Sequence, residues 1–204
     1  MKRLHRHDLY SWSEFNEERN IDFHGLLWVR PGGNILVDPL PLSEHDQEHL
    51  TQLGGAAWIV ITNSDHVRDA LMIAKHTGAK LAGPKAESAT FPISCERWLG
   101  DGDELIAGLK ALALEGSKSP GELALLIDND TLVTGDLVRA HEGGRLCILP
   151  DPKLSNKGLA IASVKRLAAF PEIEAVLTGD GWPVFRDGHQ RLNELLQALE
   201  NSTG

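Results

Sequence analysis

Cysteine is scarce in this chain: Cys95 and Cys147 are the only two among 204 residues. They lie far apart in the sequence and form no Cys-x-x-Cys pair, so the sequence predicts neither a disulfide framework nor a thiolate zinc site. We expect both to be buried or inert thiols.

Long apolar runs and basic clusters are also missing. No run approaches the roughly 18 apolar residues that a membrane-spanning helix needs, and the polar segment 1–8 lacks the apolar core of a signal peptide. The formal net charge is -9, and no stripe of Lys and Arg is available to neutralise a phosphate backbone. We therefore expect a cytoplasmic protein that binds a small molecule, and neither nucleic acid nor a membrane.

The remaining composition is that of an ordinary globular protein, with 42% hydrophobic and 24% charged residues. A chain of this length fits one sizeable domain with its own core. Because no low-complexity linker or strict repeat interrupts it, we predict a single domain over residues 1–204. A homodimer is compatible with the sequence, which does not select it.

Short apolar runs predict a mixed α/β fold. Strand-like runs occupy residues 25–29, 35–38, 58–62, 80–82, 104–106, 110–114, 122–127, 131–134 and 175–178. Helical patterns occupy residues 43–53, 67–77, 157–169 and 191–200. The turn at 128–130 joins two strand patterns as a hairpin, and the irregular stretch 140–156 is the candidate lid or interface loop. Hairpins beside strand-helix alternation indicate mixed sheets with helices on the outer faces.

Polar residues follow four of the apolar runs, at Gly or Pro turns. They are Asp38, the pair Asp65 and His66, Asp136, and Asp180. Side chains at the carboxyl ends of strands converge on the ligand crevice in layered α/β folds. Any one of these aspartates could instead cap a helix or bind loop amides. Four of them at equivalent places favour a shared, carboxylate-rich pocket.

The order and spacing of these strand ends resemble the metallo-β-lactamase fold, a superfamily of mostly zinc-dependent hydrolases, over residues 25–186. Family members carry an Asp-Pro turn, a THxHxDH motif, a GHSPGS-like loop, a Gly-Asp turn and a final GHG. The corresponding segments here are Asp38-Pro39, residues 62–66, residues 116–122, Gly135-Asp136, and residues 179–181. The resemblance implies a four-layer αββα sandwich with two mixed sheets and helices on its outer faces.

Most of the family's metal-binding histidines are absent. Read without a gap, Asn63 and Asp65 replace the HxH pair, and Val67 and Arg68 replace the DH pair. Read with a two-residue deletion before Ser64, Asp65 and His66 are the DH pair and the HxH pair is lost. In either register, Lys118 stands at the histidine of the loop and Asp180 at that of the final GHG.

Two outcomes stay open for the metal. In the gapped register, Asp65, His66, Asp136 and Asp180 form one remaining half-site suited to Mn, Fe or Zn, which could activate a water for hydrolysis. In the ungapped register, Arg68 and Lys118 pair with the three aspartates in a charge network without metal. At most one divalent metal is therefore expected, or none.

The resemblance implies a hydrolase-like protein with a degenerate site that acts on an ester, a thioester or a lactone. Asp65, His66 and Lys118 are the candidate catalytic residues. Asn63, Arg68, Lys118 and Trp182 are the candidate substrate-binding residues. The alternative is a non-catalytic binding or structural protein that reuses the fold. A Ser-Lys mechanism at residues 117–119 is a minor alternative.

Overall fold

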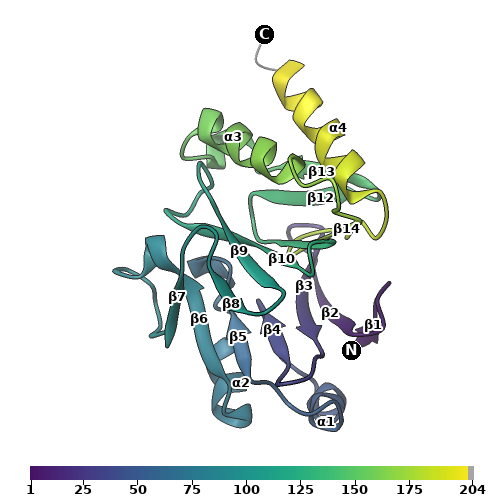
Figure 1. Ribbon diagram of the computed structural model, residues 1–204, viewed down its shortest axis with the longest axis vertical. Helices are drawn as coiled ribbons and strands as arrows, with labels where there is room; N and C mark the ends of the chain where they lie inside the picture. Colours follow the sequence, from purple (N-terminus) through teal and green to yellow (C-terminus); the bar gives the residue numbers. More distant parts are fainter. Residues whose placement is uncertain (202–204) are drawn as a thin grey trace.

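Two β-sheets pack face to face, and each carries helices on its outer face (Figure 1). This arrangement belongs to the computed structural model, which describes residues 1–201. The order of the layers is helix, sheet, sheet, helix. The predicted αββα sandwich with two mixed sheets is confirmed.

The first sheet has seven strands in sequence order. They are β1 (Lys2–Arg3), β2 (Leu9–Asn16), β3 (Ile21–Trp28), β4 (Ile35–Val37), β5 (Trp58–Val60), β6 (Lys80–Pro84) and β7 (Arg97–Leu99). The first four pair antiparallel, whereas β4 to β7 pair parallel. The parallel half is connected by α1 (Glu44–Gln52) and α2 (Ala70–Thr77).

The second sheet has five strands in the order β14-β11-β10-β9-β8. They are β8 (Glu104–Ile106), β9 (Leu109–Leu114), β10 (Glu122–Ile127), β11 (Thr131–Thr134) and β14 (Ala175–Thr178). Only β11 and β14 pair parallel. Between them the chain forms the hairpin of β12 (Val138–Glu142) and β13 (Arg145–Ile148), followed by α3 (Lys157–Ala168). The last helix is α4 (Gly188–Asn201).

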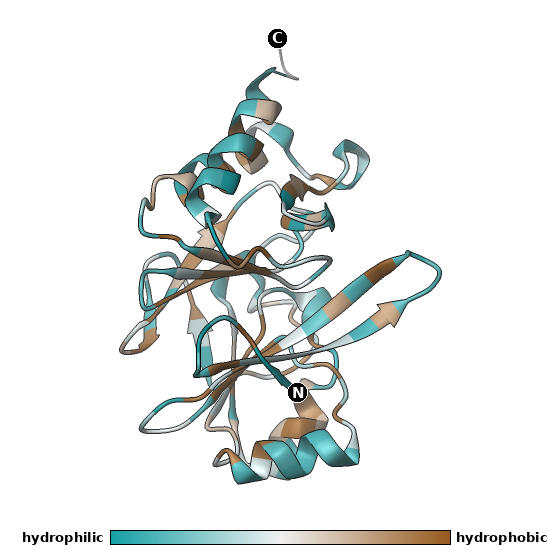
Figure 2. Ribbon diagram, turned by 90° about the vertical axis from the view of Figure 1, so that its right-hand side faces the viewer, coloured by the Kyte–Doolittle hydropathy of each residue, from teal (hydrophilic) through white to brown (hydrophobic). Residues whose placement is uncertain are grey.

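Hydrophobic side chains separate the layers into three clusters. The central cluster joins the facing sides of both sheets, where Leu26, Val37 and Val60 meet Leu125 and Val133. A second cluster lies under α1 and α2, and a third lies under α3 and α4. Figure 2 shows hydrophobic residues along the strands and hydrophilic residues on the outward faces of the helices. Burial of these apolar faces is the main stabilising contribution, at roughly 25 cal/mol per Å².

Several predicted boundaries are wrong. The strands β1, β2 and β7 had no predicted counterpart, and β3 begins four residues before its predicted start at Gly25. The helix predicted over 67–77 begins only at Ala70, because Arg68 has a left-handed backbone (φ 42°) that interrupts it. The segment 140–156 is not irregular throughout, since β12 and β13 form a hairpin whose turn holds Gly143 and Gly144.

Arg6 ties the N-terminal segment to the second sheet. The guanidinium of Arg6 donates hydrogen bonds to Asp8, Asp128 and Asp130. The last two belong to the predicted hairpin turn of the second sheet, which is confirmed. Within residues 1–201, no helix is long and apolar enough to cross a membrane.

Candidate functional site

A buried imidazole, His66, lies at the centre of the rim where β4, β5, β11 and β14 end. It follows β5 in a single 3-10 turn, Ser64–His66, which the side chain of Asn63 caps by accepting the Asp65 backbone N–H. The Nδ1 atom of His66 lies 2.8 Å from Oδ2 of Asp38, at the end of β4. A carboxylate at Nδ1 fixes the ring and leaves Nε2 directed to the other side.

Asp38 is held by more than the imidazole. Its Oδ1 accepts the Thr62 backbone N–H at 2.8 Å, and its Oδ2 accepts the Thr62 hydroxyl at 2.6 Å. Burial would raise the pKa of Asp38, but His66, the Arg68 charge and these hydrogen bonds outweigh it and hold the pKa below its usual range. Asp38 is therefore a charged carboxylate that orients His66.

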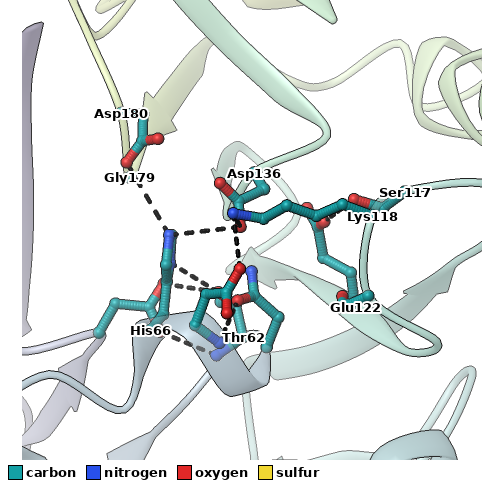
Figure 3. Close-up of polar contacts among 12 residues, drawn as sticks. Thr62, His66, Ser117, Lys118, Glu122, Asp136, Gly179 and Asp180 are labelled. Carbon is teal, nitrogen blue, oxygen red and sulfur yellow. Dashed lines mark hydrogen bonds and ion pairs between the residues drawn. The ribbon is translucent and has the colours of Figure 1, made fainter. Parts of the chain in front are cut away.

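Two further carboxylates converge on the free nitrogen of His66. Asp136 follows β11, and Asp180 follows β14. Their nearest oxygens lie 3.7 Å and 3.8 Å from His66 Nε2. Figure 3 shows the imidazole directed between the two aspartates. One ligand atom from each residue lies within 4.8 Å of the other two, and all three side chains are buried.

Lys118 reaches the same carboxylates from the loop between β9 and β10. Its Nζ lies 3.0 Å from Asp136 Oδ2 and 2.7 Å from Asp65 Oδ2 (Figure 3). Burial lowers the pKa of Lys118, but hydrogen bonds and charge interactions with Asp65 and Asp136 outweigh it and raise the pKa above its usual value. The ammonium group is therefore charged at neutral pH, so it is no general base.

Two guanidinium groups neutralise Asp180. Arg68 NH2 lies 3.4 Å from Asp180 Oδ1 and 3.5 Å from His66 Nε2, while its NH1 donates to the backbone carbonyls of His24 and Asp38. Arg139, from β12, donates to Asp180 Oδ2 and lies 4.0 Å from Asp136 Oδ1. Burial lowers the pKa of both arginines, which stay charged because the starting value is so high.

Glu122 is a buried carboxyl group that connects the Lys118 loop and the Asp136 turn through hydrogen bonds. It is 0% exposed, accepts the Ser117 hydroxyl at 2.6 Å and accepts the Leu137 backbone N–H at 2.8 Å. It thereby joins the loop that carries Lys118 to the turn that carries Asp136. Burial, and next the charge of Asp136, raise the pKa of Glu122 to about 7. Since Ser117 is fully buried and bound to Glu122, it offers no free nucleophile for a Ser-Lys mechanism.

The structure brings most of the predicted site residues to this one rim. His66, Asp136 and Asp180 converge, and Arg68 and Lys118 contact them. Asp65 turns away from His66 and pairs with Lys118, with its side chain 58% exposed. Asn63 is fully buried, and its Nδ2 has no hydrogen-bond partner among the described residues. Trp182 is 59% exposed.

Neither proposed register of residues 62–69 describes the geometry alone. His66 lies beside Asp136 and Asp180, as in the gapped register, but the predicted fourth ligand, Asp65, lies outside that group. Arg68 and Lys118 lie among the carboxylates, as in the ungapped register. Both features coexist because the 3-10 turn directs Asp65 outward and His66 inward, and the left-handed Arg68 then turns back to the rim.

Two contributors had no signal in the sequence that marked them as part of the site. Arg139 stands three residues after Asp136, just before the stretch predicted to be irregular, and Glu122 begins a predicted strand. Asp38 was identified as a strand-end residue of the pocket, but its bond to His66 depends on the parallel pairing of β4 and β5. The Gly135 next to Asp136 also lies so close to Thr62 and Asn63 that a Cβ would stand 2.6 Å from the Thr62 hydroxyl.

The donor set fits one divalent ion and not two. An oriented imidazole nitrogen and two buried carboxylates make a nitrogen-oxygen set that Zn, Mn or Fe accepts. Oδ2 of Asp136 is buried and has no hydrogen-bond partner among residues 1–201, although Lys118 pairs with it by charge. No second group of three His, Cys, Asp or Glu ligands exists among the described residues.

A family model described as the metallo-beta-lactamase superfamily matches residues 1–199. Among curated proteins, none matches the chain. Among solved structures, VMB-1 at pH 5.5 has 11% identity and a TM-score of 0.75, with 99% of this chain and 97% of that chain covered.

Two other solved structures are similar over nearly their whole length. A metallo-beta-lactamase from Hirschia baltica has 16% identity and a TM-score of 0.69, and 92% of each chain is covered. The metallo-beta-lactamase FIM-1 from Pseudomonas aeruginosa, in its mono-zinc form, has 14% identity and a TM-score of 0.73, with 96% of this chain and 91% of that chain covered. Likenesses at such low identity concern the fold.

Proposed function

Since the chain belongs to the metallo-β-lactamase superfamily, we propose that it is a hydrolase with a reaction centre for a single divalent ion. His66, Asp136 and Asp180 would hold that ion, and the substrate is a small ester, thioester or lactone. The observation that carries the proposal is the Asp38–His66 bond, which aims Nε2 at two buried carboxylates.

An ion at this place would supply Lewis acidity to hydrolysis. The protein's own groups do the rest. Asp38 keeps the imidazole in the orientation that presents Nε2. Lys118, which is 30% exposed, is the cation on the site's open side and would bind an anionic group of the substrate. Its exposed partner Asp65 is the carboxylate that such a group displaces.

A second candidate function is binding without catalysis. It is favoured by Arg68 and Arg139, whose guanidinium groups both contact Asp180. Arg68 NH2 also lies 3.5 Å from the nitrogen that an ion would need. In that case the cations of the chain replace the metals of the superfamily, and the pocket retains a small anion beside Lys118.

Metal titration separates the two candidates. Protein treated with a chelator and then given Zn²⁺ or Mn²⁺ is expected to bind one equivalent by calorimetry. Because the ion binds the folded state, it should also stabilise the protein and raise its melting temperature. The added free energy of unfolding is about 2.7 kcal/mol when the free ion is at ~100 times its dissociation constant. Asp136→Asn and Asp180→Asn should each lose this binding.

The matched control is Asp65→Asn, which removes an exposed carboxylate outside the converging group and should leave binding intact. If no ion binds, or if both buried-site variants bind as well as the unmodified protein, the hydrolase proposal fails. Lys118→Gln then reports on the substrate. It should raise KM for an ester that carries a carboxylate and leave KM unchanged for a neutral ester.

A further inference from the structure

The two sheets do not cover each other completely at the N-terminal edge. β14 is the edge strand of the five-stranded sheet, whereas the seven-stranded sheet continues through β2 to β1. The chain after Asp180 closes part of this overhang, where Val184 forms a bridge with Val176 of β14. A space between the sheets remains there, and Lys2 of β1 and Ser11 and Ser13 of β2 line it.

This space is a cavity of about 340 Å³. Its inner walls are apolar side chains from both sheets, among them Leu26 and Val37 of the first and Val133 and Leu177 of the second. Cavities of this size with mostly apolar walls and few polar groups are typical of small-molecule sites. Phe185, which is 38% exposed, lines the cavity from the segment that closes the overhang.

One polar atom of the cavity wall lacks a hydrogen-bond partner within residues 1–201. The Nε2 atom of His24 is buried and has no hydrogen-bond partner among the described residues. A buried polar atom without a partner costs free energy, so such atoms are rare in native proteins. His24 is on the same face of β3 as Leu26, which points between the sheets.

The charges of the neighbours select an uncharged ligand. Asp38 also lines the cavity, and its oxygens are taken by Thr62 and His66. The buried charge of Asp38 repels an anion from the inner wall, and a cation would find no free acceptor on Asp38. Lys2 also lines the cavity, but it is exposed and can keep its charge in solvent. Burial lowers the pKa of His24 below its usual value, so the imidazole is neutral at pH 7. A neutral imidazole nitrogen is a donor or an acceptor according to its tautomer, and a hydroxyl group can satisfy either.

We propose that this cavity is a second binding site, for a neutral and largely apolar molecule whose hydroxyl group bonds to His24 Nε2. Phenols and medium-chain alcohols belong to this class. The site is distinct from the reaction centre, since Lys118, Asp136 and Asp180 do not line it. Asp38 and Gly179 form the shared wall between the two.

Equilibrium dialysis with 2-naphthol and naphthalene tests the proposal. Both compounds fit an apolar cavity, but only 2-naphthol carries a hydroxyl. The unmodified protein should bind one equivalent of each, with 2-naphthol about three- to tenfold tighter because of one hydrogen bond. His24→Phe keeps an aromatic ring and should bind both compounds equally. A preference for 2-naphthol that survives in His24→Phe would overturn the assignment.

Blocking the cavity gives a second, independent measurement. Ser13 is exposed at the cavity wall, so Ser13→Trp can add bulk there without disturbing the core, and it should abolish the binding of both compounds. Ser88→Trp is the matched control, since Ser88 is also exposed and does not line the cavity. Asp136→Asn should bind 2-naphthol normally. No saturable binding by the unmodified protein, equal binding by both tryptophan variants, or loss in Asp136→Asn would each refute the proposal.

Discussion

Replacing Asp38 with alanine is expected to lower the free energy of unfolding by about 3–5 kcal/mol, the usual cost of breaking a buried charged network by removing one partner. The substitution leaves the Thr62 amide, the Thr62 hydroxyl and His66 Nδ1 buried without their acceptor. Each unpaired buried donor costs about 1–3 kcal/mol. Urea denaturation at pH 7 measures the loss.

The pH dependence of this difference identifies its cause. The pKa of Asp38 is lower in the folded protein than its ordinary value of 3.8, so its contribution is present above that value and is lost as pH falls through the folded pKa. The difference in free energy of unfolding between the unmodified protein and Asp38→Ala should therefore become smaller at acid pH.

Asp38 has a φ of 45°, so alanine at this position also adds backbone strain. This part of the stability loss must be distinguished from the part caused by removing the carboxylate. Asp187→Ala is the control, because Asp187 is exposed with a φ of 58°. Asp187→Ala should lower the free energy of unfolding far less than Asp38→Ala does. If the two variants lose similar stability, the carboxylate of Asp38 does not hold the site together.

Substituting Glu122 with glutamine is expected to remove a large pH dependence of stability. The carboxyl of Glu122 has a pKa of about 7 in the folded protein, against 4.5 ordinarily. Between these values the folded state keeps a proton that the unfolded state has lost, so the free energy of unfolding falls as pH rises. The whole decline amounts to about 3 kcal/mol.

Glutamine stays neutral at every pH and can still accept the Leu137 N–H. Across the window between the two pKa values, Glu122→Gln should therefore gain about 3 kcal/mol relative to the unmodified protein. Denaturation series in chelator-containing buffers would show it. Glu104→Gln, at an exposed position on β8, should follow the unmodified profile. If the free energy of unfolding varies with pH in the same way in the unmodified protein and in Glu122→Gln, then Glu122 is ionised over the whole pH range between the two pKa values.

The sequence predicts the fold well because apolar runs and turn residues are local signals. The buried strands β5, β11 and β14 and the hairpin turn at 128–130 are all at their predicted places. β2 escaped prediction because it is an outer strand, with several polar and exposed side chains along it. Its place depends on pairing with β3, which is a tertiary contact that no local pattern reveals.

The site was predictable in position and less so in its contacts. Strand ends marked Asp38, His66, Asp136 and Asp180, because parallel strands deliver their carboxyl ends to one rim. The direction of each side chain was not predictable. One short 3-10 turn decides that His66 points inward and Asp65 outward, and it depends on the buried Asn63 cap. Arg139 arrives through a hairpin whose path depends on packing under α4.

The charged centre is shared between the two sheets, and this has a consequence for the order of folding. Asp38 and His66 come with the first sheet, whereas Lys118, Asp136 and Asp180 come with the second. Neither half of the chain contains the complete set, and its members are far apart until the sheets dock. We therefore expect the charges to meet late, after the hydrophobic faces have packed together. Substitutions that break the charged centre should then raise the unfolding rate and leave the folding rate nearly unchanged.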